Sequence, residues 1–292
     1  MSRGLQVAIL LSVLSAASYA LAAVVQETLA VAGHRSVPRW LLMLALTGAG
    51  AGLHVVALSF GTVGVVQALG ALTLLLAMPI AALRTRTPVS AAAWRDAALT
   101  VVGLAGLLAL TVAPDTAATL TDVQGKCLSM TTVVAVAGLA CVARLVSSPL
   151  VRSLSYAAAS GIAFGVASVL VKTQTVDLSA LVWPAVITIG LLAGGGLLLG
   201  QLSYRGAGLA APLATVSVTN PVVAATVGVV LLGEGFRFGT AGLVPAAVAG
   251  AVAARGVVGL ARRSAVAEPA PAPAGTAVRE PAMSASGACP AP

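Results

Sequence analysis

Charged residues are scarce in this chain. Asp, Glu, Lys and Arg make up only 8% of its 292 residues, whereas hydrophobic residues make up 59%. A soluble domain carries about 25% charged residues, so this chain lacks the polar side chains needed to cover a globular surface in water. The composition therefore excludes an ordinary soluble domain and predicts a protein surrounded by lipid.

Motifs that support catalysis are also missing. No Gly-rich loop ends in Lys-Ser/Thr, which excludes ATP hydrolysis by a P-loop, and no His, Asp and Glu cluster offers a metal or acid–base site. The cysteines lack metal-ligand spacing, and Cys127 and Cys141 are expected to be small buried side chains of one apolar helix. The net charge of +8 comes from scattered basic residues rather than a basic stripe. We expect no enzyme activity, no cofactor, no bound metal and no nucleic-acid partner.

What the chain has instead is long apolar runs. A run of about 20 apolar residues can cross a bilayer as a helix. Only Gly61 interrupts the second and third runs, so a tight turn is expected there. Nine such runs predict an all-α, polytopic membrane protein with helices at 5–29, 39–59, 62–83, 93–113, 124–145, 153–172, 180–203, 207–232 and 239–261.

The basic residues predict the orientation of these helices. Loops on one side hold eleven Lys and Arg residues, against four on the other. Because cytoplasmic loops are rich in Lys and Arg, we expect the N-terminus outside the plasma membrane and the C-terminus in the cytoplasm. The first run resembles a signal peptide, but its removal would place Arg35 and Arg39 outside, against this pattern. Residues 264–292, rich in Ala and Pro, predict a disordered cytoplasmic tail.

The chain also carries an internal repeat. A shift of 145 aligns the ends of the first and sixth runs, with Tyr19 opposite Phe164 and Thr28 opposite Thr173. A shift of 144 aligns residues 52–73 with 196–217, where chance would give roughly two or three identities. Six are found: Gly52/Gly196, Leu53/Leu197, Leu58/Leu202, Ser59/Ser203, Gly64/Gly208 and Leu69/Leu213.

This repeat predicts the organisation of the chain. Residues 1–123 and 146–263 form two four-helix repeats, and residues 124–145 form a connector helix between them. A single connector inserts the two copies in opposite orientations. Inverted repeats are the architecture of secondary transporters, whose binding site lies between the copies.

Two segments of the second half, Ser160 to Lys172 and Pro212 to Glu234, have residues that resemble the drug/metabolite transporter superfamily, of the EamA-like type. The segment from Pro212 through Asn220-Pro221 to Leu231-Leu232-Gly233-Glu234 is similar to that family's penultimate-helix signature. The stretch from Ser160 to Lys172 is similar to its entry into the second half. The resemblance covers about residues 5–260 and implies a membrane carrier.

Two segments of the first half resemble one branch of this superfamily more closely. Val24-Val25-Gln26-Glu27 and Gly64-Val65-Val66-Gln67-Ala68-Leu69 are similar to the NIPA-type magnesium transporters and their bacterial relatives, which have nine spans. The chain departs from the family pattern at Ala68, where relatives usually place Pro, and at Arg84, where the Glu234 equivalent would stand.

Ionisable residues inside spans are costly and are candidate functional residues by default. Glu27 and Lys172 occupy equivalent places in the two repeats, so they would act as gates at the two ends of a path, or extend toward the lipid headgroups. Small multidrug resistance proteins resemble half of this fold and carry a glutamate in mid-membrane on their first helix. Glu27 departs from that pattern because it lies near the helix end.

Uncharged polar side chains at membrane depth need hydrogen-bond partners. They either bond between helices or line a polar cavity, and the candidates are His54, Gln67, Gln201, Asn220, Tyr19 and Tyr204. Asn220-Pro221 is the strongest of these, since proline frees a backbone carbonyl and the pair is expected to break its helix.

The sequence thus predicts a secondary transporter that moves a small solute across the plasma membrane by alternating access. The resemblance also leaves open the transport of Mg²⁺ or another divalent cation. A third hypothesis, from another class, is a membrane scaffold or regulator that transports nothing. The expected partners are the lipid bilayer and a small-molecule or ion substrate, with homodimer formation left open.

Overall fold

A computed structural model of the chain describes residues 3–32, 36–58, 60, 66, 69–112, 120–175 and 183–267. Within these ranges eight helices are long and apolar enough to cross a membrane, and α4 is a shorter apolar helix. The chain is therefore an all-α, multi-pass membrane protein, as its composition predicts. Its helices are α1 (Arg3–Ala32), α2 (Val37–Leu58), α4 (Leu72–Thr85), α5 (Ala91–Leu110), α6 (Asp122–Leu145), α7 (Pro149–Thr175), α8 (Trp183–Ser203), α9 (Ala210–Leu231) and α10 (Leu243–Ala267), with a short 3-10 turn η2 (Gly239–Gly242) before α10.

The helix ends follow local sequence signals. The Ser90 hydroxyl caps α5 by accepting from the backbone N–H of Ala93 at 3.2 Å. Thr121 and Gln124 form a reciprocal capping box at the start of α6. The predicted third span, 62–83, differs most from the structure, since α4 begins only at Leu72 and residues 61–65 and 67–68 lie outside the described residues.

The outer surface of the bundle is apolar. Leu41, Met130 and Leu191 are 61%, 69% and 72% exposed. A water-soluble protein rarely leaves large apolar patches uncovered, so lipid is the solvent that suits this surface. Cys127 and Cys141 are exposed as well. The prediction that they are buried was wrong, because α6 packs mainly against α7 and turns most of its circumference outward.

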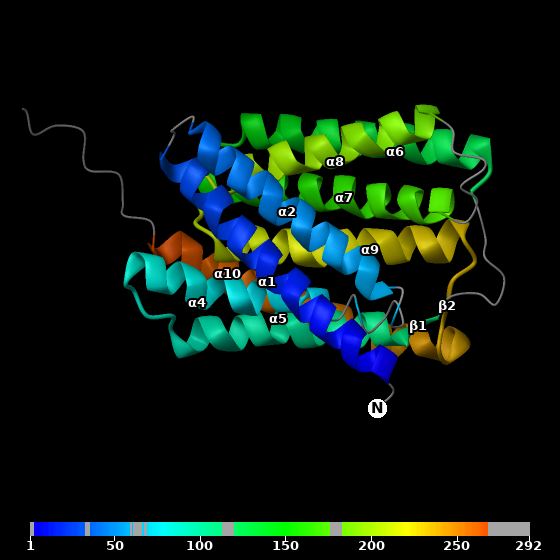
Figure 1. Cartoon of the computed structure of the whole chain (residues 1–292), viewed down its shortest axis with the longest axis horizontal. Coiled ribbons are helices and arrows are strands. Elements are labelled where there is room, and N and C mark those ends of the chain that lie inside the picture. The colour runs from blue at the N-terminus through cyan, green and yellow to red at the C-terminus, as the bar shows by residue number, and fades with distance from the viewer. Residues whose placement is uncertain are drawn as a thin grey trace, which may run out of the picture.

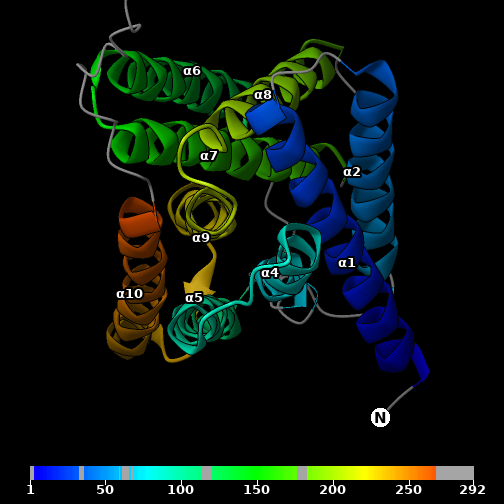
Figure 2. The ribbon, with the colours of Figure 1, turned by 90° about the vertical axis from the view of Figure 1, so that its left-hand side faces the viewer.

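The helices run roughly side by side along the long axis of the molecule, with α1 and α2 crossing the others obliquely (Figure 1). Viewed end-on, α9 lies in the middle of the bundle, with α7 on one side and α5 and α10 on another (Figure 2). The most extensive helix pairs are α1–α2, α7–α8, α7–α9 and α5–α10. The α5–α10 and α4–α9 contacts join the N-terminal half to the C-terminal half.

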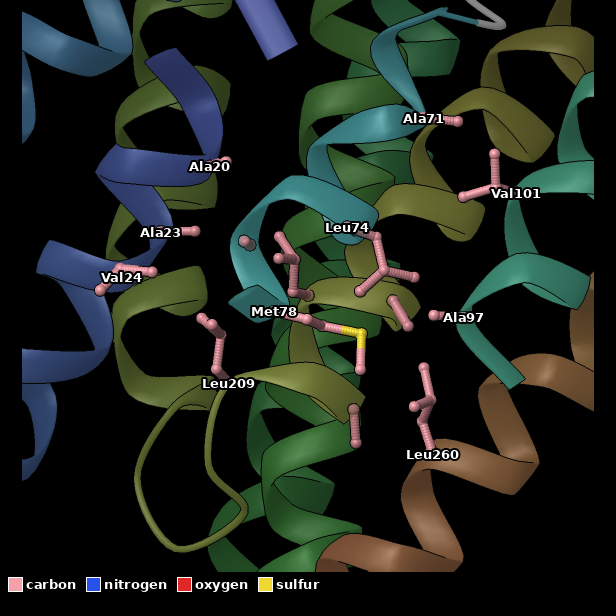
Figure 3. Close-up of a cluster of buried hydrophobic side chains, with 14 of the residues drawn as sticks. Ala20, Ala23, Val24, Ala71, Leu74, Met78, Ala97, Val101, Leu209 and Leu260 are labelled. Atoms are coloured by element: carbon pink, nitrogen blue, oxygen red, sulfur yellow. The ribbon is translucent and has the colours of Figure 1, made fainter. Parts of the chain in front are cut away.

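One hydrophobic cluster fills the space between the two halves. In Figure 3, Leu74 and Met78 of α4 lie between the small side chains of α1 and those of α5. Small residues let helix backbones approach closely in lipid, where packing replaces the hydrophobic force. The labelled members of this cluster are Ala20, Ala23, Val24, Ala71, Leu74, Met78, Ala97, Val101, Leu209 and Leu260.

A short β-ladder that the sequence did not predict ties the halves together at one end. β1 (Thr111–Val112) follows α5 and pairs antiparallel with β2 (Gly235–Phe236), which lies between α9 and α10. The backbone N–H of Arg237 extends the ladder by donating to the carbonyl of Leu110 at 2.8 Å. The ladder therefore fixes the loop before α10 to the end of α5.

Candidate functional site

Glu27 lies near the C-terminal end of α1 and forms an ion pair with Arg84, close to the end of α4. A second nitrogen of Arg84 donates to the hydroxyl of Thr28 at 2.9 Å. The Glu27 side chain is 13% exposed and that of Arg84 is 38% exposed. Arg84 is thus the ion-pair partner of Glu27, the first candidate gate residue.

Gln201 reaches the same end of α1 from the second half of the chain. It lies near the end of α8, and its Nε2 donates to the backbone carbonyl of Gln26 at 2.7 Å. Because a carbonyl can only accept, this bond fixes the orientation of the amide. The Gln201 Oε1 is then left buried with no hydrogen-bond partner in the described structure. A buried polar atom without a partner costs about 1–3 kcal/mol.

Tyr204 completes this group, in the turn that follows α8. It is only 3% exposed. Burial raises the pKa of Tyr204, and the nearby carboxylate of Glu27 raises it further. The turn is held by the Ser153 hydroxyl, which donates to the carbonyl of Ser203. Gly208, with a φ of +65°, adopts a conformation in that turn that favours glycine.

The structure therefore brings together three of the eight predicted site residues, from both halves of the chain. These three residues, Glu27, Gln201 and Tyr204, form a group together with Gln26 and Arg84. We call this group of five the polar junction. The junction combines an ion pair, a hydrogen bond between the halves and an unpartnered amide oxygen. It can therefore bind a polar group or hold the two halves together at this end.

The other predicted residues lie apart from the junction. The Tyr19 ring packs against Gly50 of α2. His54 is half-buried on α2, where its ring lies 4.0 Å from a Cβ built on Gly70. Gln67 and the side chain of Lys172 fall outside the described residues.

Asn220 lies on α9 where that helix packs on α7. A Cβ built on Gly165 would lie only 2.6 Å from the Asn220 carbonyl oxygen, and one on Gly161 would lie 2.7 Å from the Cβ of Thr219. Because these two glycines of α7 have no side chain, the α9 backbone can pack directly on α7. The predicted break at Asn220-Pro221 is absent, since α9 continues from Ala210 to Leu231. A membrane helix can continue past a proline where a neighbouring helix packs closely against it, as α7 does here.

Sequence reasoning missed Asp96. This residue of α5 is fully buried and accepts hydrogen bonds from Arg95 at 3.1 Å and from Arg263 of α10 at 2.9 Å. Arg95 and Arg263 belong to the eleven basic residues that predict the orientation of the helices. A carboxylate about one turn inside an apolar run needs a cationic partner, and that signal would have identified it.

Two pockets lie between α5 and α10, and neither is lined by a predicted site residue. Among the described residues, no group of three or more His, Cys, Asp or Glu side chains could hold a metal ion. A comparison of the chain with protein-family models, with curated proteins and with solved structures finds no match.

Proposed function

We propose that this protein is a secondary transporter that moves a small solute across the membrane by alternating access, with the polar junction as a gate at one end of the path. The observation that carries the proposal is the hydrogen bond between Gln201 in the second half and Gln26 in the first. A gate needs contacts between the halves that can form and break. The hydrogen bond between the halves is worth only about 1 kcal/mol, and the partly exposed Glu27–Arg84 ion pair, which lies within the first half beside it, is worth no more.

Matching contacts in the two halves support an internal repeat. The Ser15 hydroxyl of α1 donates to the carbonyl of Gly50 in α2 at 2.7 Å, and the Ser160 hydroxyl of α7 donates to the carbonyl of Gly196 in α8 at 2.7 Å. Ser15 and Ser160 are related by the same shift of 145 as Tyr19 and Phe164.

The aromatic pair extends this match. Tyr19 packs on Gly50 and Phe164 on Gly196, with ring atoms 3.1 Å and 3.3 Å from a Cβ built on the glycine. Gly50 and Gly196 differ by 146 positions, so the contacts pair Gly50, rather than Gly52, with Gly196. We propose that α1, α2, α4 and α5 form one repeat, that α7 to α10 form the other in inverted orientation, and that α6 connects them.

The charge pattern supports an orientation with the N-terminus outside and the C-terminus in the cytoplasm. In this orientation the polar junction is the cytoplasmic gate. Reporter fusions to the C-terminus test it directly. A signal from a reporter that is active only outside the membrane would overturn both the orientation and the side assigned to the gate.

The path itself is proposed to run along α9. This helix lies in the middle of the bundle (Figure 2), yet every residue from 215 to 225 is half-buried rather than buried. Polar side chains at this depth include Thr215, Ser217, Thr219 and Asn220. Partial exposure in the middle of a bundle is what a polar path between two halves requires.

The sequence resemblance to the drug/metabolite superfamily supports the same class of carrier, with an organic solute as the main candidate substrate. Mg²⁺ is the second candidate. The observation in its favour is the unpartnered Oε1 of Gln201, whose amide bonds to Gln26, the residue before Glu27 in the chain, because magnesium prefers oxygen ligands.

The direct test is uptake by the purified protein in liposomes, with Mg²⁺ and a panel of organic solutes, each with and without a pH gradient. We expect one organic solute to enter liposomes that contain the protein faster than it enters protein-free liposomes. Gln201→Ala should slow this uptake, whereas Gly194→Ala, where an added Cβ meets nothing within 4 Å, should not. Folded protein that moves no solute would favour the scaffold hypothesis. Mg²⁺ uptake that survives both Glu27→Ala and Gln201→Ala would overturn the role of the junction.

A further inference from the structure

An apolar groove of about 630 Å³ runs between α5 and α10. Its edges are strongly exposed, with Val102 at 66%, Val244 at 69% and Val248 at 58%. Small residues form its floor, where Gly103 and Gly106 of α5 face Ala249 of α10. The groove is lined by Val102, Gly103, Gly106, Ala109, Leu110, Val244, Pro245, Val248, Ala249 and Val252.

A second pocket of about 520 Å³ lies at the end of the same two helices. It is basic, with four arginines and one carboxylate, which gives a net charge of +3 (four minus one). In the proposed orientation it lies at the cytoplasmic side. It is lined by Ser90, Arg95, Asp96, Arg255, Gly259, Arg262 and Arg263.

The groove and the pocket share one face of the helix pair. On α10, Val248, Val252, Arg255 and Arg262 follow at intervals of four, three and seven residues, which places them on one side of a helix. On α5 the same holds for Arg95, Val102, Gly106 and Ala109. The surface is therefore continuous, apolar at membrane depth and basic at its end.

The arginines fall into two pairs. Arg95 and Arg263 are held in place by the buried carboxylate of Asp96. Arg255 and Arg262 lie exposed on α10, so their positive charge faces the pocket without a carboxylate contact among the described ion pairs. The pocket thus has two arginines that Asp96 holds in place and two arginines whose positive charge is available to a ligand.

We propose that this surface binds an anionic phospholipid, with the phosphate on the arginines and an acyl chain along the groove. Arginine pairs with phosphate through two parallel N–H donors, and basic pockets between membrane helices at the cytoplasmic side suit anionic headgroups. From Arg255 to Pro245 the helix rises about 15 Å. This is about half the hydrocarbon thickness of a bilayer, which is the depth that the acyl chains of one leaflet reach.

The apolar groove is the reason to choose a lipid over free phosphate, which needs only the arginines. The proposal is independent of the transport proposal, since none of these residues belongs to the polar junction. It therefore stands or falls by a binding measurement rather than by uptake.

The test is native mass spectrometry of the full chain in detergent, which reports bound lipid and oligomeric state together. The protein is titrated with phosphatidylglycerol, with phosphatidylcholine of the same acyl chains, and with inorganic phosphate. We expect one phosphatidylglycerol to remain bound at concentrations where phosphatidylcholine does not. In Arg255→Gln/Arg262→Gln this binding should weaken by roughly fivefold for each arginine removed.

Two comparisons separate a specific site from general attraction. Arg152→Gln/Arg205→Gln removes two exposed charges elsewhere and should bind phosphatidylglycerol as the unaltered protein does. Gly106→Leu fills the groove and should weaken binding although every arginine remains. The proposal fails if both lipids bind alike, if the two double variants lose binding equally, or if phosphate competes fully and Gly106→Leu has no effect. It also fails if the protein is a dimer that Gly106→Leu dissociates, because the groove is then occupied by a second copy.

Discussion

The side-chain amide of Gln201 donates a hydrogen bond to the backbone carbonyl of Gln26, which lies 175 residues earlier in the chain. This bond joins α8 to α1 and leaves the other end of the amide buried without a partner. The arrangement is costly for a purely structural contact. That cost is the basis of the first prediction.

Gln201→Leu should leave the unfolding free energy unchanged or higher. The substitution loses one hydrogen bond, worth about 1 kcal/mol, but it also removes a buried oxygen that costs about 1–3 kcal/mol. Uptake of the substrate should nevertheless fall. Thermal unfolding in detergent and liposome uptake check the two halves of this prediction, and a large loss of stability would show that Gln201 is mainly a packing residue.

Arg84→Gln should loosen the end of α1 to which Gln201 bonds and so open the proposed cytoplasmic gate. The variant breaks the pair with Glu27, and a pair with this exposure is worth about 0.5–1 kcal/mol. The readout is the rate at which Ser217→Cys reacts with a membrane-impermeant thiol reagent from the cytoplasmic side. The background lacks Cys127, Cys141 and Cys289.

We expect faster labelling in Arg84→Gln, and no change in Arg86→Gln, which alters an exposed residue in the turn after α4. Equal rates in both variants would contradict a gating role for the Glu27–Arg84 pair.

Gly165→Ala should destabilise the contact between α7 and α9. The added Cβ would lie 2.6 Å from the backbone oxygen of Asn220, and overpacking of this kind costs about 1–3 kcal/mol. Gly194→Ala on α8 is the matched control, since nothing lies within 4 Å of its added Cβ. It should be neutral or stabilising by up to about 1 kcal/mol. Unfolding temperatures in detergent that rank the two variants the other way would refute this helix packing.

Asp96→Asn should lower stability by about 1–2 kcal/mol. Removing one partner from a fully buried pair costs 3–5 kcal/mol, but here the side chains of Arg95 and Arg263 are 61% and 40% exposed, so water compensates part of the loss. Asp122→Asn, an exposed change in the first turn of α6, should cost about 0.5 kcal/mol or less. Equal losses from the two variants, measured by chemical unfolding, would argue against a structural role for Asp96.

Ionisation of Tyr204 should lower the free energy of unfolding at high pH. Its raised pKa means that the folded protein holds the phenol proton more tightly than the unfolded chain does. The stability from Tyr204 is therefore complete below about pH 10, the pKa of an unperturbed tyrosine. Above that pH it declines by about 1.4 kcal/mol per unit, because the unfolded state ionises first. Tyr204→Phe should show a shallower decline between pH 10 and 11 than the unaltered protein.

The positions of most helices could be predicted from the sequence because apolar runs bounded by Gly, Pro and Arg are local features. The contacts between helices could not, since they depend on how each helix is rotated about its axis. Gln201 and Glu27 were recognised as polar residues in apolar surroundings, but nothing local indicated that Gln201 would bond to Gln26. The prediction that α9 breaks at Pro221 was wrong for a related reason. The packing that supports α9 comes from Gly161 and Gly165, which belong to another helix.

The close approach of α5 and α10 has a mechanical consequence. A Cβ built on Gly103 would lie 2.6 Å from the carbonyl oxygen of Ala249, and one on Gly256 would lie 2.6 Å from the backbone nitrogen of Thr100. Two helices in backbone contact cannot slide along each other without steric clash. If the protein is a carrier, as proposed, the two halves would turn about the line of contact between α5 and α10. The ends of α1 and α8 that lie farthest from this axis would then move the furthest.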